Sequence, residues 1–201
     1  MSALYLISVK IARVRGLISI GAERALCAEL QRLPECIEQT LKCQSDMQRI
    51  ATLYANRSSV FFLGRGLDYA AALEASLKLK EISYIHSEAY AAGELKHGTI
   101  SLIEEGTLVA AVLTQENLYK KMISNMVEVR TRGAFVMAVT VEGNTEVERA
   151  ADYVIYIPET NKYFTNSLAI IPLQLFAYYI SIGRGCDVDK PRNLAKSVTV
   201  E

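Results

Sequence analysis

The chain has 201 residues, of which 51% are hydrophobic, and its 22 basic and 22 acidic side chains cancel to a formal net charge of zero. This composition is too apolar and too weakly charged for a disordered chain, and it lacks the basic excess that a broad nucleic-acid footprint needs. The longest apolar stretch, residues 168–182, contains Pro172 and Gln174 and falls short of the roughly 20 residues that span a bilayer, so we expect no membrane segment.

The cysteines and the N-terminus indicate a cytoplasmic protein without a metal site. The first three of the four cysteines are not spaced as the close pairs of a zinc ribbon, and the chain has only two histidines. We therefore expect reduced thiols and no metal or cofactor. No cationic segment precedes an apolar run at the N-terminus, so no signal peptide is expected either.

The first 57 residues are expected to be helical, because no strand signal appears before residue 58. A helix is predicted over residues 3–15, ending at Gly16, because apolar side chains recur on one face: Leu4, Ile7, Ile11 and Val14. Residues 23–55 are also helical in composition. Pro34 interrupts them, so we expect two or three helices with short joints there.

From residue 58 the pattern changes to short apolar runs that alternate with helical segments. Continuous apolar runs of five or six residues are typical of strands buried on both faces, and here they occupy residues 59–63, 108–113, 134–139 and 153–157. The helical segments between and after them are residues 69–82, 117–132, 145–150 and 167–182. We predict an α/β fold with three layers, a flavodoxin-like parallel sheet with helices on both faces, preceded by the N-terminal helices.

Ligands of such sheets bind beyond the carboxyl ends of the strands, so the residues after each strand are candidate site residues. Gly64, Arg65 and Gly66 follow the first strand and precede a helix, where backbone amides could face an anion. A tight strand-to-helix turn requires glycine in any case. The motif is therefore compatible with an anion site or with a purely structural turn.

Glu74, Lys78 and Glu81 have helical spacing and are expected to project from one face of their helix. The opposite faces would hold the apolar residues Ala71, Leu73, Leu77, Leu79 and Ile82. Such a row is either a solvated salt-bridge stripe or the mouth of a site, in which a charged lysine stands beside a carboxylate that acts as a general base.

Two further residues have the chemistry of a site. His97 ends a segment rich in small residues and can exchange a proton near neutral pH, whereas His86 is expected to be structural. The C-terminal tail, residues 187–201, mixes a proline, spread charges and an apolar ending, as expected of a segment that docks. A docked tail could present Lys196 to a carbonyl substrate for Schiff-base chemistry, although most lysines near a terminus are only solvated.

Three segments together resemble the glutamine–fructose-6-phosphate aminotransferase family, also called glucosamine-6-phosphate synthases. They are residues 73–84 (LEASLKLKEISY), 87–98 (SEAYAAGELKHG) and 189–201 (DKPRNLAKSVTVE). The resemblance covers essentially the whole chain. It implies a sugar isomerase (SIS) domain over residues 58–201, the second of two in the isomerase half of that enzyme, with residues 1–57 leading out of the first.

The resemblance also implies roles for particular residues in a reaction that turns fructose 6-phosphate into glucosamine 6-phosphate. Lys196 matches the lysine that forms a Schiff base with the open-chain sugar, and Glu81 the glutamate that moves a proton between C1 and C2. His97 matches the histidine of ring opening, which comes from the neighbouring subunit of a homodimer. Lys78 accompanies the glutamate, and two positions match substrate contacts: Glu74 and Ala195.

The chain also departs from the family. It has no cysteine at position 2, where a glutaminase domain would begin, and the phosphate-gripping loop of a first SIS domain is not recognisable. The corresponding loop, residues 114–117, has one hydroxyl and Glu116, whose charge would repel a phosphate. Thr99 replaces a proline common in relatives. We therefore expect a fragment that needs the glutaminase and first SIS domains to act on a sugar phosphate.

Two other functions stay open from the sequence. A stand-alone SIS domain could bind a sugar phosphate without turnover, as regulators of this fold do, and the fragment could also serve as a scaffold that only dimerises. The catalytic-looking tail argues against a pure sensor, because a sensor has no need of a Schiff-base lysine.

Overall fold

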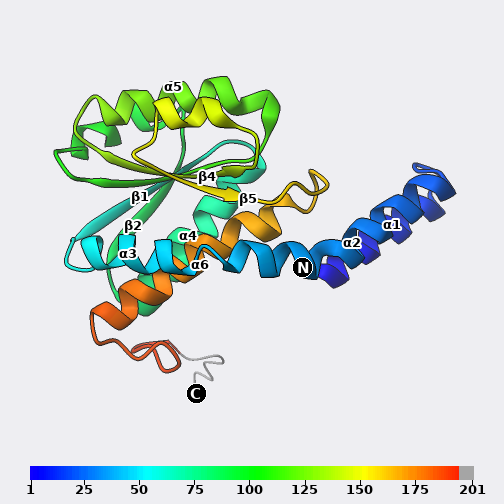
Figure 1. Cartoon of the computed structure of the whole chain (residues 1–201), viewed down its shortest axis with the longest axis horizontal. Coiled ribbons are helices and arrows are strands. Elements are labelled where there is room, and N and C mark those ends of the chain that lie inside the picture. Colours follow the sequence, from blue (N-terminus) through cyan, green and yellow to red (C-terminus); the bar gives the residue numbers. More distant parts are fainter. Residues whose placement is uncertain (195–201) are drawn as a thin grey trace, which may run out of the picture.

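The computed structural model describes residues 1–194 and shows a parallel sheet of five strands. In the order β2-β1-β3-β4-β5, each strand pairs in parallel with its neighbours (Figure 1). The strands are β1 (Ser59–Gly64), β2 (His86–Ala91), β3 (Leu108–Leu113), β4 (Phe135–Val141) and β5 (Tyr153–Ile157). The predicted α/β class and the four predicted strands are confirmed.

The edge strand β2 was not predicted, because it lacks a continuous apolar run. It pairs with β1 alone, and its sequence, HSEAYA, alternates polar and small side chains. Only Ser87 in it is fully buried; its hydroxyl donates to the carbonyl oxygen of Ser76 at 2.7 Å. An edge strand is covered less than a central one, so it does not need the apolar residues that reveal central strands.

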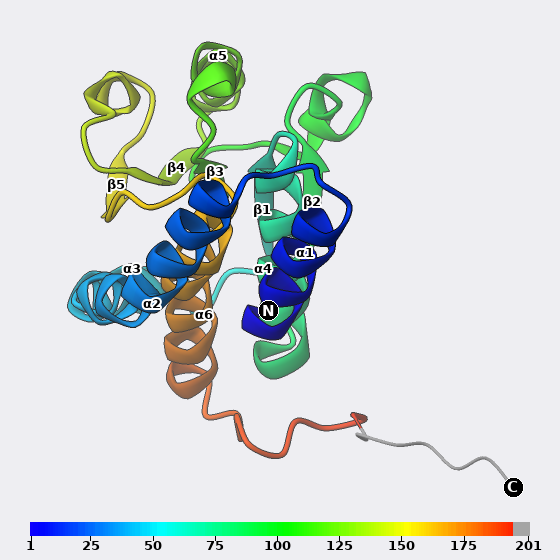
Figure 2. The same cartoon turned by 90° about the vertical axis from the view of Figure 1, so that its right-hand side faces the viewer.

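Helices cover both faces of the sheet, as predicted (Figure 2). One face carries α4 (Leu67–Ser83), α6 (Thr165–Gly183) and the N-terminal helix α3 (Gln44–Tyr54). The other carries α5 (Tyr119–Arg130) and four short 3-10 helices. These are η1 (Leu95–His97), η2 (Thr99–Leu102), η3 (Glu116–Leu118) and η4 (Thr145–Arg149), the last of which replaces the helix predicted at 145–150.

Each central strand contributes alternate residues to two separate hydrophobic cores. Val60 and Phe62 of β1 belong to the core under α3, α4 and α6, whereas Phe61 and Leu63 belong to the core under α5. Strand residues alternate between the two faces, so a strand between two helical layers must be apolar throughout. This explains why these strands could be recognised from their sequence.

The N-terminal region contains α1 (Ser2–Val14) and α2 (Ile20–Leu41), followed by α3. The expected two helices with a short joint are confirmed, but the break at Pro34 is wrong, because α2 continues through the proline to Leu41 and the joint lies at Lys42 and Cys43. Leu33 and Cys36, on either side of the proline, are buried in the main core. Their burial offsets the hydrogen bond that proline cannot donate.

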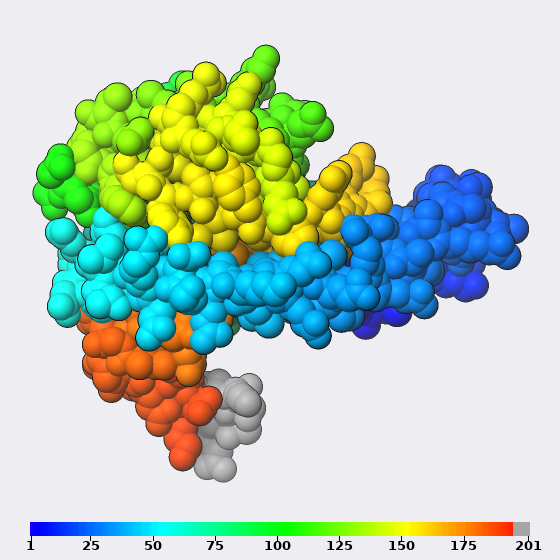
Figure 3. Space-filling model, in the orientation of Figure 1, coloured from blue at the N-terminus to red at the C-terminus, as the bar shows by residue number. Residues whose placement is uncertain are grey.

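The helix α1 and the first part of α2 project from the body of the molecule (Figure 3). Tyr5 anchors α1: its hydroxyl lies 2.9 Å from Ser167 Oγ, and its ring meets Phe164 edge-on, with centroids 4.7 Å apart. The predicted helix and its end at Gly16 are confirmed. Its predicted apolar face is more than half exposed: Leu4, Ile7, Ile11 and Val14.

Of the described residues, only α6 forms a helix long and apolar enough to cross a membrane, with 19 residues and a mean hydropathy of 1.3. It is longer than the apolar stretch that the sequence indicated. However, α6 packs between α3 and α4, and Phe176, Ala177 and Ile180 are fully buried there (Figure 2). Its place in the core accounts for its apolarity.

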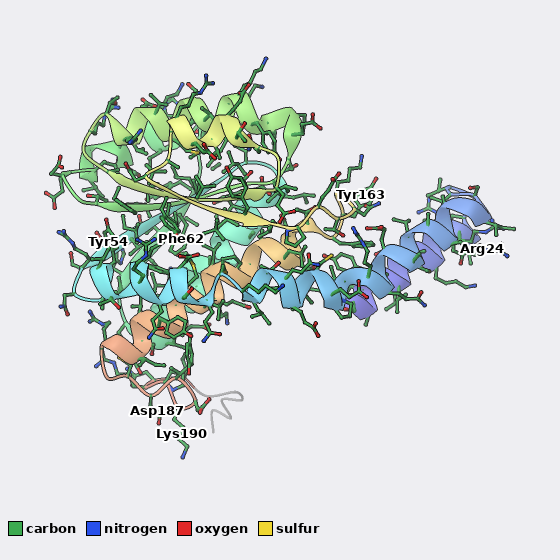
Figure 4. All side chains as sticks on the ribbon, viewed as in Figure 1. Arg24, Tyr54, Phe62, Tyr163, Asp187 and Lys190 are labelled. Carbon is green, nitrogen blue, oxygen red and sulfur yellow. The ribbon has the colours of Figure 1, made fainter. Side chains whose placement is uncertain are left out.

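The side chains of α3 belong to the same core as the sheet. Tyr54 of α3 and Phe62 of β1 both lie in the body of the molecule, and Met47 and Ile50 are buried beside them (Figure 4). The division into residues 1–57 and 58–201 stays a prediction. In the structure, α3 cannot be removed without exposing the core that α6 completes.

We expect Met47→Ala to lower the free energy of unfolding of the whole chain by about 2–5 kcal/mol, because it empties a fully buried site. Leu53→Ala, on the exposed side of the same helix, should change it by no more than about 0.5 kcal/mol. Urea unfolding followed by circular dichroism measures both. Equal effects of the two substitutions would contradict the assignment of α3 to the main core.

Candidate functional site

The predicted charged row exists on the outer side of α4. Lys78 Nζ lies 2.6 Å from Glu81 Oε2 and 3.7 Å from Glu74 Oε1, so one ammonium group joins both carboxylates. The hydrogen bond that Lys78 donates to Glu81 is the main cause that raises the pKa of Lys78; partial burial opposes the rise, and Glu74 adds to it. Lys78 is therefore a firmly charged cation between two carboxylates.

The surroundings of the row differ from the prediction in one respect. Leu73 and Leu77 were expected on the opposite face, but they are 46% and 42% exposed and lie on the outward side of α4. The buried side is made instead of small residues and one leucine: Ala71, Ala72, Ala75, Ser76 and Leu79. The row therefore borders apolar surface on one flank, which the simple spacing argument did not show.

The row does not lie at the carboxyl edge of the sheet, where ligands of this fold class commonly bind. Since α4 begins just after β1 and runs back along it, Glu81 lies about 20 Å from the start of the helix, near the amino ends of the strands. The sequence indicated candidate sites both at the carboxyl edge of the sheet and at the charged row. The structure shows that Glu81 of the row and this edge are at opposite ends of α4.

The structure does not bring His97 to the row. His97 ends η1, whose Leu95 is buried in the core under α5, whereas α4 packs on the core of the other face. Its nearest charged partner is Glu94, with Nε2 and Oε2 3.9 Å apart, and both side chains are well exposed. His86, expected to be structural, is exposed beside Glu88 at 3.6 Å. Within one chain, His97 and Glu81 are therefore separated by the sheet.

At the carboxyl edge, the turn Gly64-Arg65-Gly66 is explained by contacts within the chain. A Cβ on Gly64 would lie 2.4 Å from the backbone of Asp68, so only glycine fits there. The Arg65 guanidinium donates to Asn125 Oδ1 from Nε at 3.1 Å and Nη2 at 2.9 Å, and Gln115 donates to the Arg65 carbonyl oxygen. These contacts support the structural turn rather than the anion site.

Polar groups of the loop at residues 114–117 are also bonded within the chain. Thr114 donates to Asp68 twice, from its backbone N at 2.8 Å and from its hydroxyl at 2.6 Å. Asp68 is only 2% exposed, and burial raises the pKa of its carboxyl, although the hydrogen bonds from Thr114 lower it in part. The crevice beside this pair, about 610 Å³ in volume, is also lined by Glu116 and Glu159. A phosphate would meet no free hydroxyl of Thr114 here.

Within the described residues, the tail contacts the body of the molecule through Arg192, and most of residues 187–194 are exposed. Asp187 Oδ1 accepts hydrogen bonds from the backbone N of Asp189 and Lys190, both at 3.0 Å, and shapes a turn beyond α6 (Figure 4). The backbone N of Arg192 then donates to Tyr84 Oη at 2.7 Å. The tail thus reaches the residue that ends α4, three positions after Glu81. Ala195 and Lys196 lie outside the described residues.

Sequence reasoning missed Tyr84 and Arg192 as partners. Their contact joins positions 108 apart, and neither residue type signals it.

Within residues 1–194, His, Cys, Asp and Glu side chains form no group of three or more that could hold a metal ion. The four cysteines are free thiols, and burial, with Asp46 nearby, raises the pKa of Cys43 to about 11.

Comparison with known proteins identifies the class. The sequence model of the SIS domain family matches residues 53–183, so the chain belongs to the SIS domain family. Curated proteins that it resembles include glutamine–fructose-6-phosphate aminotransferases. That of Caldanaerobacter subterraneus is 54% identical over 99% of this chain, and that of Methanosarcina acetivorans is 47% identical over all of it. The resemblance inferred from the three motifs is thereby confirmed.

A solved structure agrees with this result. The C-terminal domain of glucosamine-fructose-6-phosphate aminotransferase from Francisella tularensis matches with a TM-score of 0.85 and 31% identity, covering 92% of this chain and 52% of that one. The chain spans about one third of the length of its curated relatives, 33% for the Caldanaerobacter protein. The relatives therefore contain further sequence for which this chain has no counterpart.

Asp68 should make stability depend on pH. Burial raises the pKa of the Asp68 carboxyl, so its protonated form stabilises the folded state relative to the unfolded chain. This contribution to the free energy of unfolding is complete below about pH 4 and is lost as the pH rises through the pKa of the folded state. Asp68→Asn stays neutral and can keep both contacts with Thr114. Relative to this variant, the unaltered chain should lose free energy of unfolding as the pH rises above about 4, measured in urea. Parallel pH profiles would refute a raised pKa.

Proposed function

We propose that this chain supplies the isomerase half-site of a glutamine–fructose-6-phosphate aminotransferase, which makes glucosamine 6-phosphate from fructose 6-phosphate and glutamine. The observation that carries the proposal is the arrangement at the end of α4. There Lys78 holds Glu74 and Glu81 together, and the C-terminal tail docks within one helical turn of Glu81. The identity to enzymes of that name, 54% to the Caldanaerobacter protein, supports the same assignment.

The length of the tail is compatible with a role for Lys196 at this row. Arg192 contacts Tyr84, which lies about 4.5 Å along the helix axis from Glu81. Lys196 follows Arg192 by four positions, and four steps of extended chain span at most about 14 Å. A lysine side chain adds several ångströms to that reach. We therefore place the amine of Lys196 and the carboxylate of Glu81 in one site.

The chemistry follows from these two groups. The amine of Lys196 adds to the C2 carbonyl of the open-chain sugar and releases water, which leaves an iminium ion. The iminium withdraws electrons from C1 and acidifies its C–H bond, so a carboxylate is a sufficient base. Before the proton moves, ammonia from glutamine displaces the Lys196 amine at C2, which frees the lysine and leaves the sugar with an iminium group from ammonia. Glu81 then takes the proton from C1 and returns it to C2, and the C1 hydroxyl loses its proton as the aldehyde of glucosamine 6-phosphate forms. Lys78 places a fixed positive charge beside Glu81, and Glu74 and Ala195 contact the substrate.

The position of His97 supports a homodimer. It is exposed and follows Leu95, which lies in the core on the face of the sheet opposite to α4, so we expect it to serve the row of a neighbouring chain and not that of its own. We assign it to ring opening in the site of the partner subunit.

The phosphate of the substrate requires another domain. Here the Thr114 hydroxyl is bonded to Asp68, and the two glutamates that line the adjoining crevice, Glu116 and Glu159, outnumber its one lysine, Lys162, so we expect this domain to bind the phosphate only weakly. We infer that the glutaminase and first SIS domains of a longer, cytoplasmic enzyme complete the site. The length of the relatives supports this inference.

The catalytic assignment can be tested in a chimera in which this chain replaces the matching third of the Caldanaerobacter enzyme. Glu81→Gln should lower the rate of glucosamine 6-phosphate formation by about 10²–10⁴-fold, because it removes the proton acceptor. Lys196→Ala should abolish it, since no other amine takes its place. Lys80→Gln, on the same helix but outside the row, serves as the control. Full activity of the Lys196→Ala chimera would refute the Schiff-base role.

The isolated chain should not bind fructose 6-phosphate at micromolar concentrations, because the hydroxyl of Thr114 is already bonded to Asp68. Isothermal titration calorimetry with this sugar and with glucosamine 6-phosphate tests this expectation. Glucose serves as the control for binding that does not involve the phosphate. Micromolar binding of a sugar phosphate would instead favour a non-catalytic sensor.

A further inference from the structure

Tyr84 has an unusual backbone conformation at the end of α4. It lies in the left-handed region, with φ 61° and ψ 17°, and is one of two residues other than glycine with positive φ within residues 1–194. The other is Asn193, a residue type that tolerates this region. Helices commonly end on glycine at this position, because a side chain there costs free energy. A tyrosine at this place suggests that its side chain is needed.

The backbone turn itself does not need the tyrosine ring. Ser181 Oγ donates to the Ile82 carbonyl oxygen at 2.8 Å, and Arg184 Nε donates to that of Ser83 at 2.9 Å. Both bonds come from the end of α6 and hold main-chain atoms of α4. Any residue at position 84 would leave them in place, so they do not account for the choice of tyrosine.

The side chain of Tyr84 is engaged by a single residue of the tail. Its hydroxyl oxygen accepts the hydrogen bond from the backbone N of Arg192, and the Arg192 guanidinium lies over its ring, with Cζ 4.1 Å from the centroid. A cation over an aromatic face and a hydrogen bond to the same side chain reinforce each other. Pro191 restricts the backbone just before this contact, and Asp187 orders the turn that leads to it.

We propose that Tyr84 and Arg192 form a clasp that holds the C-terminal tail against the end of α4 and so positions Lys196 for its reaction at Glu81. The contact between tail and helix stands on the geometry alone. The last step, the placement of Lys196, rests on the proposed function. Tyr84 and Arg192 are positioning residues in this assignment and do not touch the sugar.

Limited trypsin digestion of the 201-residue chain tests the clasp. Trypsin must take the Arg192 side chain into its own pocket, so Arg192 is protected while it is stacked on Tyr84. In Tyr84→Gly, cleavage after Arg192 should be about tenfold faster, because both contacts are lost. Tyr84→Phe keeps the ring and loses the hydroxyl, so its rate should lie between those of Tyr84→Gly and the unaltered chain. Mass spectrometry of the product that ends at Arg192 gives the rates.

The glycine variant separates the clasp from the helix end. Glycine suits a positive φ, so Tyr84→Gly should not lower the melting temperature through the backbone turn. Cleavage after Lys162, in the exposed loop between β5 and α6, is the internal reference and should not change. Unchanged cleavage after Arg192 in the folded Tyr84→Gly chain would overturn the clasp.

The link to catalysis is read separately, by trapping the Schiff base in the chimera with borohydride, which reduces the imine to a stable amine. Tyr84→Gly should lower the rate of trapping on Lys196 and kcat about tenfold, with KM changed less, because the clasp orients the amine and does not bind the sugar. If Tyr84→Gly speeds cleavage after Arg192 but leaves the rate of trapping on Lys196 unchanged, the clasp orders the tail and does not position Lys196. Absence of trapping in the unaltered chimera would refute the proposed function and leave the trypsin result standing.

Discussion

The close packing of α4 on the sheet is the contact on which the site depends. The helix buries small side chains, among them Ala71, Ala72 and Ala75, against the strands and α6, so its backbone can approach closely and its orientation is determined. Glu74, Lys78 and Glu81 then necessarily face outward. A larger residue at one of the buried alanines would displace the helix and the row together.

The two ends of α4 have different chemistry. At its start, hydrogen bonds from Arg65 to Asn125 and from Thr114 to Asp68 hold the turn after β1. The polar groups in these bonds are not available to a ligand. At its end, main-chain carbonyl groups are held by α6, and the side chain of Tyr84 receives the tail. At the carboxyl edge of the sheet, contacts within the chain therefore hold the turn after β1 and the Thr114 hydroxyl, whereas the charged row lies towards the other end of α4.

One chain holds only part of what the proposed reaction requires. His97 lies across the sheet from Glu81, and the apolar sides of α1 and α4 are exposed, including Ile7, Leu73 and Leu77. Exposed apolar surface of this kind is typical of a domain that works next to others. The chain also spans about one third of the length of its curated relatives, 33% for the Caldanaerobacter protein.

The sequence by itself determined the α/β class, four of the five strands and the helical spacing of Glu74, Lys78 and Glu81, because strands buried on both faces and one-sided helical rows leave regular patterns. It did not reveal β2, since an edge strand needs no apolar run, or the continuation of α2 through Pro34, since burial of its neighbours outweighs the local cost. Only the tertiary structure decided that the row lies at the far end of α4 from the carboxyl edge and that Arg192 meets Tyr84. Contacts between distant positions depend on how the helices pack, and no local pattern records them.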